Sequence, residues 1–272
     1  MRRRDAVALV VLVALVGAGC SRVAFIKTDP SRGDFERTSE PVEVAETAEG
    51  KARQTARNSL TLSEERLRTG DFAAAEKYAR NALAADPNSA AANTMVAVAV
   101  NAQGRAQEAG GYYLRATEIA PNDGRALNNY GTWLCANGRA KESLGWFDRA
   151  LQDPTYTTPA AAMANSGRCA LDAGDPVRAE RDLRQAIELD PNNAVALDAL
   201  ARLNFRGGRY MEARAFSERR LAAAPASAET LLLASQIEDK LGDSAAASRY
   251  GRRLREEFPG AALGNAGGSK SP

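Results

Sequence analysis

A fixed spacing of glycines constrains the fold of this chain more than any other feature. Six glycines recur 34 residues apart, with one two-residue insertion near residues 155–158, at Gly70, Gly104, Gly138, Gly174, Gly208 and Gly242. A proline accompanies each of them, at Pro87, Pro121, Pro154, Pro191, Pro225 and Pro259. A period of this length is typical of solenoids, in which short structural units stack on one another and bury a continuous core.

Small residues recur in register with the glycines and predict a tightly packed helix on either side of each one. The eighth position of the unit holds Ser63, Ala97, Gly131, Gly167, Ala201 and Ser235, and the twentieth holds Ala75, Ala109, Ser143, Ala179, Ala213 and Ala247. Small side chains at both positions let two helices approach closely. Each glycine then supplies a left-handed turn between them, which a residue without a Cβ adopts most easily.

The twenty-seventh position is regular in four units and then changes. It holds Ala82, Ala116, Ala150 and Ala186, followed by Arg220 and Leu254. This change predicts that the last two units are less regular than the others, as terminal repeats often are.

A 34-residue helix–turn–helix unit with these glycines and prolines is the tetratricopeptide (TPR) pattern. We therefore predict an all-α fold, a TPR solenoid that forms a right-handed superhelix of about six helix–turn–helix repeats within residues 51–261. The predicted repeats span 56–89, 90–123, 124–157, 160–193, 194–227 and 228–261.

The composition argues against an enzyme. The chain has no histidine, which removes the commonest general base and the commonest metal ligand. It also lacks a glycine-rich phosphate loop that follows a strand, because the stretch GNAGGSK at residues 264–270 follows no predicted strand and opens no predicted helix. We expect no catalytic residue, no metal, no cofactor and no small-molecule substrate, and we assign residues 262–272 to a disordered tail.

The N-terminus has the organisation of an export signal. Residues 1–5, MRRRD, are positively charged, and the 11 apolar residues from Ala6 to Val16 are too few for a spanning helix, which needs about 20. Small residues then precede Cys20. In the favoured interpretation, residues 1–19 are a lipoprotein signal peptide and Cys20 is acylated after cleavage. In the alternative, ordinary cleavage after Gly17-Ala18-Gly19 releases a soluble protein, and Gly17, where a lipoprotein signal usually has Leu, leaves this open.

The residues after the signal are expected to connect the anchor to the repeats. Removing Arg2, Arg3, Arg4 and Asp5 with the signal leaves 33 basic and 33 acidic residues, so no basic stripe favours nucleic acid as a partner. Residues 20–50, which include the acylated Cys20, have no sustained helical or strand period and contain two prolines and many acids. We predict a flexible tether there.

A TPR solenoid is expected to bind a partner in the concave groove lined by its first helices. The predicted groove residues are Asn128, Asn129, Thr132, Asn165, Arg168, Arg202, Phe205 and Arg206. Asn129 and Asn165 share the sixth repeat position, where an amide can donate and accept with an extended peptide, and the arginines can pair with carboxylates. A merely solvated polar face is the competing interpretation. Leu60, Leu67 and Val98 form an alternative, apolar site in repeats 1 and 2.

Two further cysteines and four aromatic residues are predicted to be structural. Cys135 and Cys169 lie on the first helices of repeats 3 and 4, at the twelfth and tenth positions, so a disulfide separation is not assured and buried free thiols are favoured. Tyr112, Tyr113, Trp146 and Phe147 fall on second helices, where core packing is expected.

Several segments together resemble one protein family. The lipoprotein leader, the six repeats, the insertion in DPTYTTPAAAMANSGRCALDAGD at residues 153–175 and the closing RYGRRLREEFPG are similar to type IV pilus biogenesis and stability lipoproteins of the PilF/PilW family. The resemblance covers residues 1–261. It implies a pilotin, a periplasmic protein that binds the pilus secretin subunit and helps it reach the outer membrane and multimerise there.

A resemblance of the leader to bacterial lipoproteins suggests a location, and two other functions remain open. Ser21 stands where inner-membrane lipoproteins of proteobacteria typically carry Asp, so we expect the periplasmic face of the outer membrane, reached through the lipid anchor. The alternative function is a periplasmic TPR adaptor for another envelope machine, in cell-wall synthesis or outer-membrane protein assembly. An enzyme of TPR architecture is the third hypothesis and lacks any nucleophile paired with a base.

Overall fold

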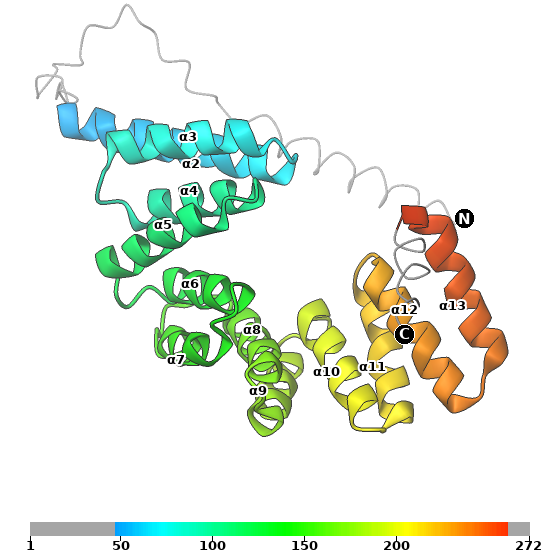
Figure 1. The fold of residues 1–272 in the computed structure, drawn as a ribbon. Helices are drawn as coiled ribbons and strands as arrows, with labels where there is room; N and C mark the ends of the chain where they lie inside the picture. Colours follow the sequence, from blue (N-terminus) through cyan, green and yellow to red (C-terminus); the bar gives the residue numbers. More distant parts are fainter. Residues whose placement is uncertain (1–46, 261–272) are drawn as a thin grey trace, which may run out of the picture. The chain divides into compact units, whose positions relative to one another are not determined.

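The chain is a series of helical hairpins throughout the part that the structure describes. In this computed structural model, residues 47–260 are described, and they hold twelve α-helices and no strand (Figure 1). The helices are α2 (Ala48–Arg68), α3 (Phe72–Ala85), α4 (Ala90–Ala102), α5 (Ala106–Ile119), α6 (Gly124–Ala136), α7 (Ala140–Ala150), α8 (Pro159–Asp172), α9 (Pro176–Leu189), α10 (Ala194–Arg206), α11 (Tyr210–Ala223), α12 (Ala228–Leu241) and α13 (Ser244–Glu257). The predicted signal peptide, Cys20, most of the tether and the tail at 262–272 lie outside the described residues.

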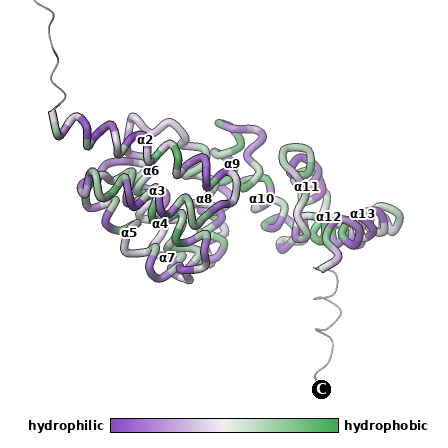
Figure 2. Tube along the Cα trace, turned by 90° about the horizontal axis from the view of Figure 1, so that it is seen from above, coloured by the Kyte–Doolittle hydropathy of each residue, from purple (hydrophilic) through white to green (hydrophobic). Residues whose placement is uncertain are grey.

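The six pairs stack in the order of the sequence. α2 packs with α3, α4 with α5, and so on to α12 with α13, and these partners lie side by side in Figure 1. From α4 onward, each first helix packs against both helices of the preceding pair. Figure 2 shows hydrophilic and hydrophobic residues alternating along the helices, as expected when each helix buries only one face. The predicted all-α TPR solenoid is confirmed.

The repeat glycines occupy the turns as predicted. All six have a positive φ, between 72° and 81°, and no other residue in the described range does. No heavy atom lies within 4 Å of where a Cβ would stand on any of the six. The glycines are therefore required by backbone conformation and not by crowding.

The two small-residue positions meet at the interface of each pair. Ala97 and Ala109 are fully buried, as are Gly167 and Ala179 on the fourth pair. At the eighth position a serine hydroxyl bonds the facing helix, since Ser63 Oγ donates to the carbonyl of Ala75 at 2.8 Å and Ser235 Oγ to that of Ala247 at 2.9 Å. At the twentieth position, Ser143 Oγ donates to the carbonyl of Ala140 on its own helix at 2.7 Å. At Gly167 a Cβ would stand 2.5 Å from Leu183 Cγ and 3.0 Å from the carbonyl oxygen of Ala179, closer than at Gly131, where the nearest atom, Phe147 Cε1, is 3.0 Å away.

The aromatic residues of the second helices belong to the core, as predicted. Tyr113 is 7% exposed and Phe147 is fully buried. Tyr112 and Trp146 are partly buried and pack against the cluster formed by α3 to α6.

The insertion between repeats 3 and 4 folds back onto the start of α6. Tyr156 is buried over Gly124, where a Cβ would lie 2.7 Å from Tyr156 Cγ and 2.8 Å from the carbonyl oxygen of Ala150. Asp153 Oδ2 accepts a hydrogen bond from the backbone N–H of Gly124 at 2.9 Å. That bond, with two from Thr155, lowers the pKa of the Asp153 carboxyl. The extra residues therefore close over a helix end and leave the helix stacking intact.

The first helix begins earlier than the sequence pattern suggested. α2 starts at Ala48, inside the segment assigned to the tether at 20–50, and two turns before the first predicted repeat at 56. Thr47 caps it, because its hydroxyl accepts from the backbone N–H of Gly50 at 3.0 Å, and Arg53 pairs with Glu49 at 3.0 Å. The prediction was wrong for residues 48–50, because local capping extends the helix beyond the part that the repeat packing specifies.

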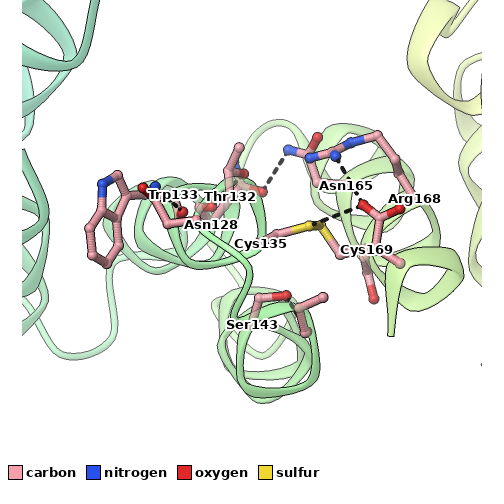
Figure 3. Close-up of a disulfide and its surroundings, with 12 residues drawn as sticks. Asn128, Thr132, Trp133, Cys135, Ser143, Asn165, Arg168 and Cys169 are labelled. Atoms are coloured by element: carbon pink, nitrogen blue, oxygen red, sulfur yellow. Dashed lines mark hydrogen bonds and ion pairs between the residues drawn. A yellow bond between two sulfur atoms is a disulfide. The ribbon is translucent and has the colours of Figure 1, made fainter. Parts of the chain in front are cut away.

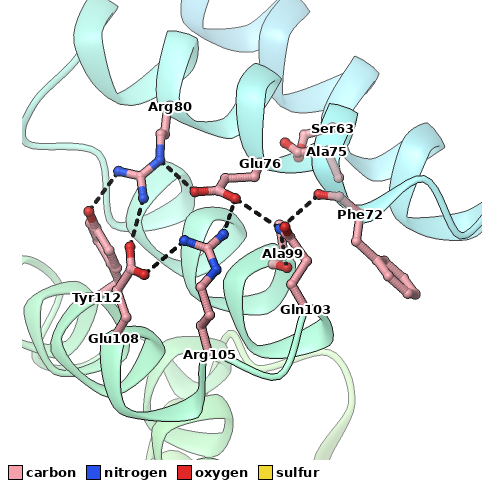
Figure 4. A network of polar contacts seen from close by, with 10 residues as sticks. All are labelled: Ser63, Phe72, Ala75, Glu76, Arg80, Ala99, Gln103, Arg105, Glu108 and Tyr112. Carbon is pink, nitrogen blue, oxygen red and sulfur yellow. Dashed lines mark hydrogen bonds and ion pairs between the residues drawn. The ribbon is translucent and has the colours of Figure 1, made fainter.

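A polar network joins repeats 1 and 2 across their second helices (Figure 4). The Glu76 carboxylate, whose side chain is 15% exposed, accepts hydrogen bonds from Arg80 at 2.8 Å, from Gln103 at 2.8 Å and from Arg105. Arg80 continues to Glu108 and to the Tyr112 hydroxyl. Partial burial disfavours ionisation of Glu76, but the three donors outweigh it and lower the pKa of its carboxyl. Glu76 therefore fixes α3 relative to α5.

Gly167→Ala is expected to lower the free energy of unfolding by about 2 kcal/mol, because the added methyl group forces Leu183 and α9 away from α8. The matched control is Gly145→Ala on α7, an exposed helical position with no heavy atom within 4 Å of the new Cβ. Its alanine should stabilise the protein by up to about 1 kcal/mol through helix propensity. Urea unfolding followed by circular dichroism measures both, and equal effects of the two substitutions would contradict the packing argument.

Glu76→Gln is expected to reduce stability at pH 7 by about 1–2 kcal/mol, because the neutral amide loses charge-assisted hydrogen bonds. The pKa of Glu76 is lower in the folded protein than in the unfolded chain, so this stabilisation is present at neutral pH and disappears as the pH falls through the folded pKa. Urea midpoints of wild type and variant should therefore converge in acid. Glu142→Gln is the control, since within residues 47–260 that exposed carboxylate pairs with Arg139 alone, and its effect should stay below about 0.5 kcal/mol.

Candidate functional site

A pocket on the first helices of repeats 4 to 6 brings part of the predicted groove together. It has a volume of about 340 Å³ and lies between α8, α10 and α12. Its lining residues are Asn165, Arg168, Ala194, Val195, Asp198, Arg202, Arg220, Ser227, Glu229 and Thr230. We refer to it as the polar pocket. Asn165, Arg168 and Arg202 were predicted from the sequence, and the structure adds the others.

The arginines of the polar pocket pair with nearby carboxylates but keep N–H groups that are not hydrogen-bonded to them. Arg202 pairs with Asp198 one turn away at 2.7 Å, and Arg168 lies 3.6 Å from Asp172. Glu229 accepts from its own backbone N–H and from the Ser227 hydroxyl, and these bonds, with the charge of Arg202, lower the pKa of its carboxyl. A guanidinium has five N–H donors, so the arginines of the pocket can still bind carboxylates or carbonyls of a partner.

Arg220 is the pocket residue that the sequence analysis misjudged. It occupies the twenty-seventh repeat position, where four earlier repeats bury alanine, and the change was interpreted only as irregularity. In the structure its Nη1 donates to the carbonyl oxygens of Ala224 at 3.1 Å and Pro225 at 3.3 Å, and the side chain lines the polar pocket. The break in an otherwise constant alanine position was the signal that could have identified it.

The four uncharged groove residues predicted in repeats 3 and 4 divide into two kinds, and Figure 3 shows three of them, Asn128, Thr132 and Asn165. Asn128 is 9% exposed and accepts a hydrogen bond from Asn165 Nδ2 at 3.1 Å, while the Thr132 hydroxyl donates to the carbonyl of Asn128 at 2.8 Å. Asn128 is therefore joined to α8 through Asn165, while the bond of Thr132 lies within α6. Asn129 is half-buried and makes no side-chain hydrogen bond within residues 47–260, and Asn165 keeps its carbonyl oxygen unused. These two amides are the ones available to a ligand.

The expectation of free thiols was wrong, because Cys135 and Cys169 form a disulfide with a Cα–Cα distance of 5.8 Å. The two-residue difference in their repeat positions was interpreted as a mismatch. Neighbouring first helices run parallel, so residues at the same position point the same way and cannot face each other. Successive helical residues rotate by about 100°, so a difference of two positions turns one side chain through about 200°, toward the other. The offset is therefore what permits the bond, which joins α6 to α8 under the groove residues.

Two predicted groove residues lie away from the polar pocket. Phe205 packs against Tyr210, with ring centroids 5.7 Å apart, and lines a different cavity beside α12 and α13. Arg206 is exposed and has no ion-pair partner in the described part of the chain. The structure therefore does not bring these two together with Asn165, Arg168 and Arg202.

The alternative apolar site in repeats 1 and 2 is partly used for internal packing. Leu60 packs against Ala56, Ala82 and Ala92, and Val98 packs against the cluster of α3 to α6. Leu67 is also half-buried. The apolar surface that these residues offer to a partner is thereby reduced, and the choice between the two sites stays a prediction.

The described residues offer no assembled metal site and no membrane span. In residues 47–260, no group of three or more acidic, cysteine or histidine side chains is placed to hold a metal ion. None of the twelve helices described is both long and apolar enough to cross a membrane.

Comparisons with known proteins give the family. Tetratricopeptide-repeat family models match residues 60–124 and 170–237. The type IV pilus assembly protein PilF of Pseudomonas aeruginosa is 28% identical over 212 residues, which are 77% of this chain and 84% of PilF.

The crystal structure of PilW, a widely conserved type IV pilus biogenesis factor, superposes with a TM-score of 0.69 at 30% identity over 76% of this chain and 95% of PilW. The structure of P. aeruginosa PilF superposes with a TM-score of 0.68 at 25% identity over 79% and 99% of the two chains. The likeness in sequence and in fold extends over 84% to 99% of these relatives, and the chain therefore belongs to the PilF/PilW family of type IV pilus biogenesis proteins built from tetratricopeptide repeats.

Proposed function

We propose that this protein is an outer-membrane lipoprotein pilotin, which binds the secretin subunit of the type IV pilus and promotes its localisation and multimerisation in the outer membrane. The observation that carries the proposal is the likeness to PilF and PilW over about three quarters of the chain. The repeats form a binding scaffold, and a pilotin acts by binding and positioning its client, without covalent chemistry.

The proposed location is supported by two features. Cys20, at the end of the apolar leader, is the site for a covalent lipid, with palmitate as one acyl chain. The disulfide between Cys135 and Cys169 favours an oxidising compartment such as the periplasm, because thiols stay reduced in the cytoplasm. A lipid on Cys20 would hold the repeats at the periplasmic face of the outer membrane.

The proposed client site is the polar pocket extended along α6 to Asn129. Asn129 and Asn165 can each donate to and accept from the backbone of an extended segment, as an amide side chain does. Arg168, Arg202 and Arg220 favour a segment that carries a carboxylate. The disulfide and the bond from Asn165 to Asn128 hold α6 and α8 in fixed relation, so little conformational freedom is lost when a ligand binds.

The anchor and the site act together in this proposal. A lipid-anchored binder confines its captured client near the membrane surface, which raises the effective concentration of secretin subunits where they must associate. A periplasmic adaptor for another envelope machine would use the same surface for a different client. The two functions are separated by deleting the gene and assaying secretin multimers in the outer-membrane fraction. Normal multimers and normal twitching motility would exclude the pilotin.

Asn129→Ala is expected to weaken capture of the secretin subunit about fivefold, because roughly 1 kcal/mol of hydrogen bonding to the client is lost. The thermal midpoint of the pilotin should not change, since Asn129 has no internal side-chain hydrogen bond in residues 47–260. The matched control is Asn81→Ala, an exposed asparagine on the second helix α3. Isothermal titration with the purified periplasmic part of the secretin measures affinity. Unchanged affinity for Asn129→Ala, with a loss for Leu67→Ala, would move the site to repeats 1 and 2.

Cys20→Ser is expected to abolish incorporation of radiolabelled palmitate and to release the protein from the outer-membrane fraction, because the sulfur is the atom that takes the diacylglycerol with its acyl chains. The Cys135→Ser and Cys169→Ser double variant is the control, since those sulfurs are bonded to each other and should leave labelling unchanged. Equal labelling of wild type and Cys20→Ser would show that no lipid is attached there, and ordinary cleavage after Gly19 would then apply.

A further inference from the structure

The last helix pair carries a cavity that the proposed secretin site does not use. It has a volume of about 710 Å³ and is formed by α12 and α13, with Phe205 of α10 at one edge. Ser235, Ala247 and Gly251 line its floor, and Asp239, Lys240, Arg252 and Arg255 surround them. We refer to it as the α12–α13 groove.

The same place on each earlier pair is filled by the first helix of the next repeat. α12 itself fills it on α10 and α11, where Leu233 and Ile237 pack against Ala201 and Ala213. Residues 34 positions later than Ala201, Phe205 and Ala213 are Ser235, Asp239 and Ala247, all of which line the α12–α13 groove. The groove is therefore shaped to receive a helix, and no helix of the described residues occupies it.

The charges around the groove are not balanced. Lys240, Arg252 and Arg255 stand against a single carboxylate, Asp239, and none of the three cations has an ion-pair partner within residues 47–260. On the preceding pair the corresponding residues are Glu218 for Arg252 and Leu221 for Arg255. A terminal repeat needs a polar outer face to stay soluble, but solubility alone does not call for charge of one sign in a concave site.

The chain itself shows how a carboxylate on an incoming helix is bound at such a place. Glu238 of α12 is 4% exposed and accepts a hydrogen bond from Arg214 Nε of α11 at 3.0 Å. The second helix of one pair thus supplies a guanidinium to the first helix of the next. On α13 the position that corresponds to Arg214 holds Ser248, and the guanidiniums that can bind such an acid come instead from Arg252, one turn later, and from Arg255.

We propose that the α12–α13 groove binds an acidic amphipathic helix of a protein partner, which docks as a seventh first helix. Its apolar side covers Ala247 and Gly251, and its carboxylates pair with Arg252 and Arg255. This inference does not depend on the polar pocket or on the secretin, because it rests on the stacking of the repeats and on the charge of α13.

The test uses the full mature chain and a defined probe, a fluorescent peptide with the sequence of residues 227–242. That peptide carries three acids and one lysine and forms the first helix α12 in the protein. Fluorescence anisotropy should give saturable binding that weakens with salt. A control peptide in which Glu229, Glu238 and Asp239 are replaced by lysine should bind at least about tenfold more weakly.

Matched protein variants locate the site. Arg252→Glu with Arg255→Glu should weaken peptide binding by about tenfold or more, because both contacts become repulsive. Arg68→Glu with Arg249→Glu makes the same change in net charge at exposed positions outside the groove and should leave the affinity unchanged. Circular dichroism melts establish that both proteins are folded.

Three results would overturn the proposal. The first is no binding of the acidic peptide, or equal binding to both double variants. The charges of the groove would then serve only to keep the terminal repeat soluble. The second is a dimer in sedimentation that Arg252→Glu with Arg255→Glu dissociates, which assigns the groove to a second copy of this chain. The third is much tighter peptide binding after removal of residues 21–46, which assigns it to that acidic stretch of the chain.

Discussion

The close approach of two helices at the eighth and twentieth repeat positions is the constraint on which the rest of this structure depends. At Gly167 the distance is so short that even one added methyl group would meet Leu183 and the carbonyl of Ala179. Such a contact buries only one side of each helix, so a single pair cannot form a core by itself. The next first helix must cover the exposed side, and the 34-residue period follows from repeating this step. The left-handed glycines are needed because each tight pair requires a short turn.

Contacts between neighbouring pairs turn the stack into a defined surface. Glu76 joins repeats 1 and 2, the disulfide joins repeats 3 and 4, and Arg214 with Glu238 joins repeats 5 and 6. These bonds are polar or covalent and therefore directional, unlike the alanine contacts inside each pair. They fix the rotation of one pair against the next, and that rotation decides which groove residues stand close together. A scaffold without chemistry of its own obtains specificity from this fixed spacing.

The sequence predicted the parts of the fold that repeat and missed the parts that occur once. The glycine turns and the buried alanines could be predicted because each recurs at the same position in several repeats, and the core aromatics Tyr113 and Phe147 because they fall on second helices. The disulfide was missed because a side chain's direction around a helix, and not its repeat position, decides which neighbour it faces. Phe205 lines a different cavity from Asn165, Arg168 and Arg202 for the same reason. Arg220 and the early start of α2 at Ala48 are single departures from the repeat, and their meaning depends on contacts that only the folded chain supplies.

The two ends of a repeat array are physically different, and this difference bears on how such a protein acts. Within residues 47–260, α2 and α3 begin the stack and α2 has no earlier pair to pack on, whereas α12 and α13 end it and leave an open place. The α12–α13 groove is lined by small residues where earlier pairs receive a helix, so it can bind one. The charged side chains around it determine which helices bind and which are repelled. Arg252 and Arg255 select for acids. A pilus biogenesis protein with one site along its first helices and another at its final pair can hold two segments at once, and each bound segment then raises the effective concentration of the other.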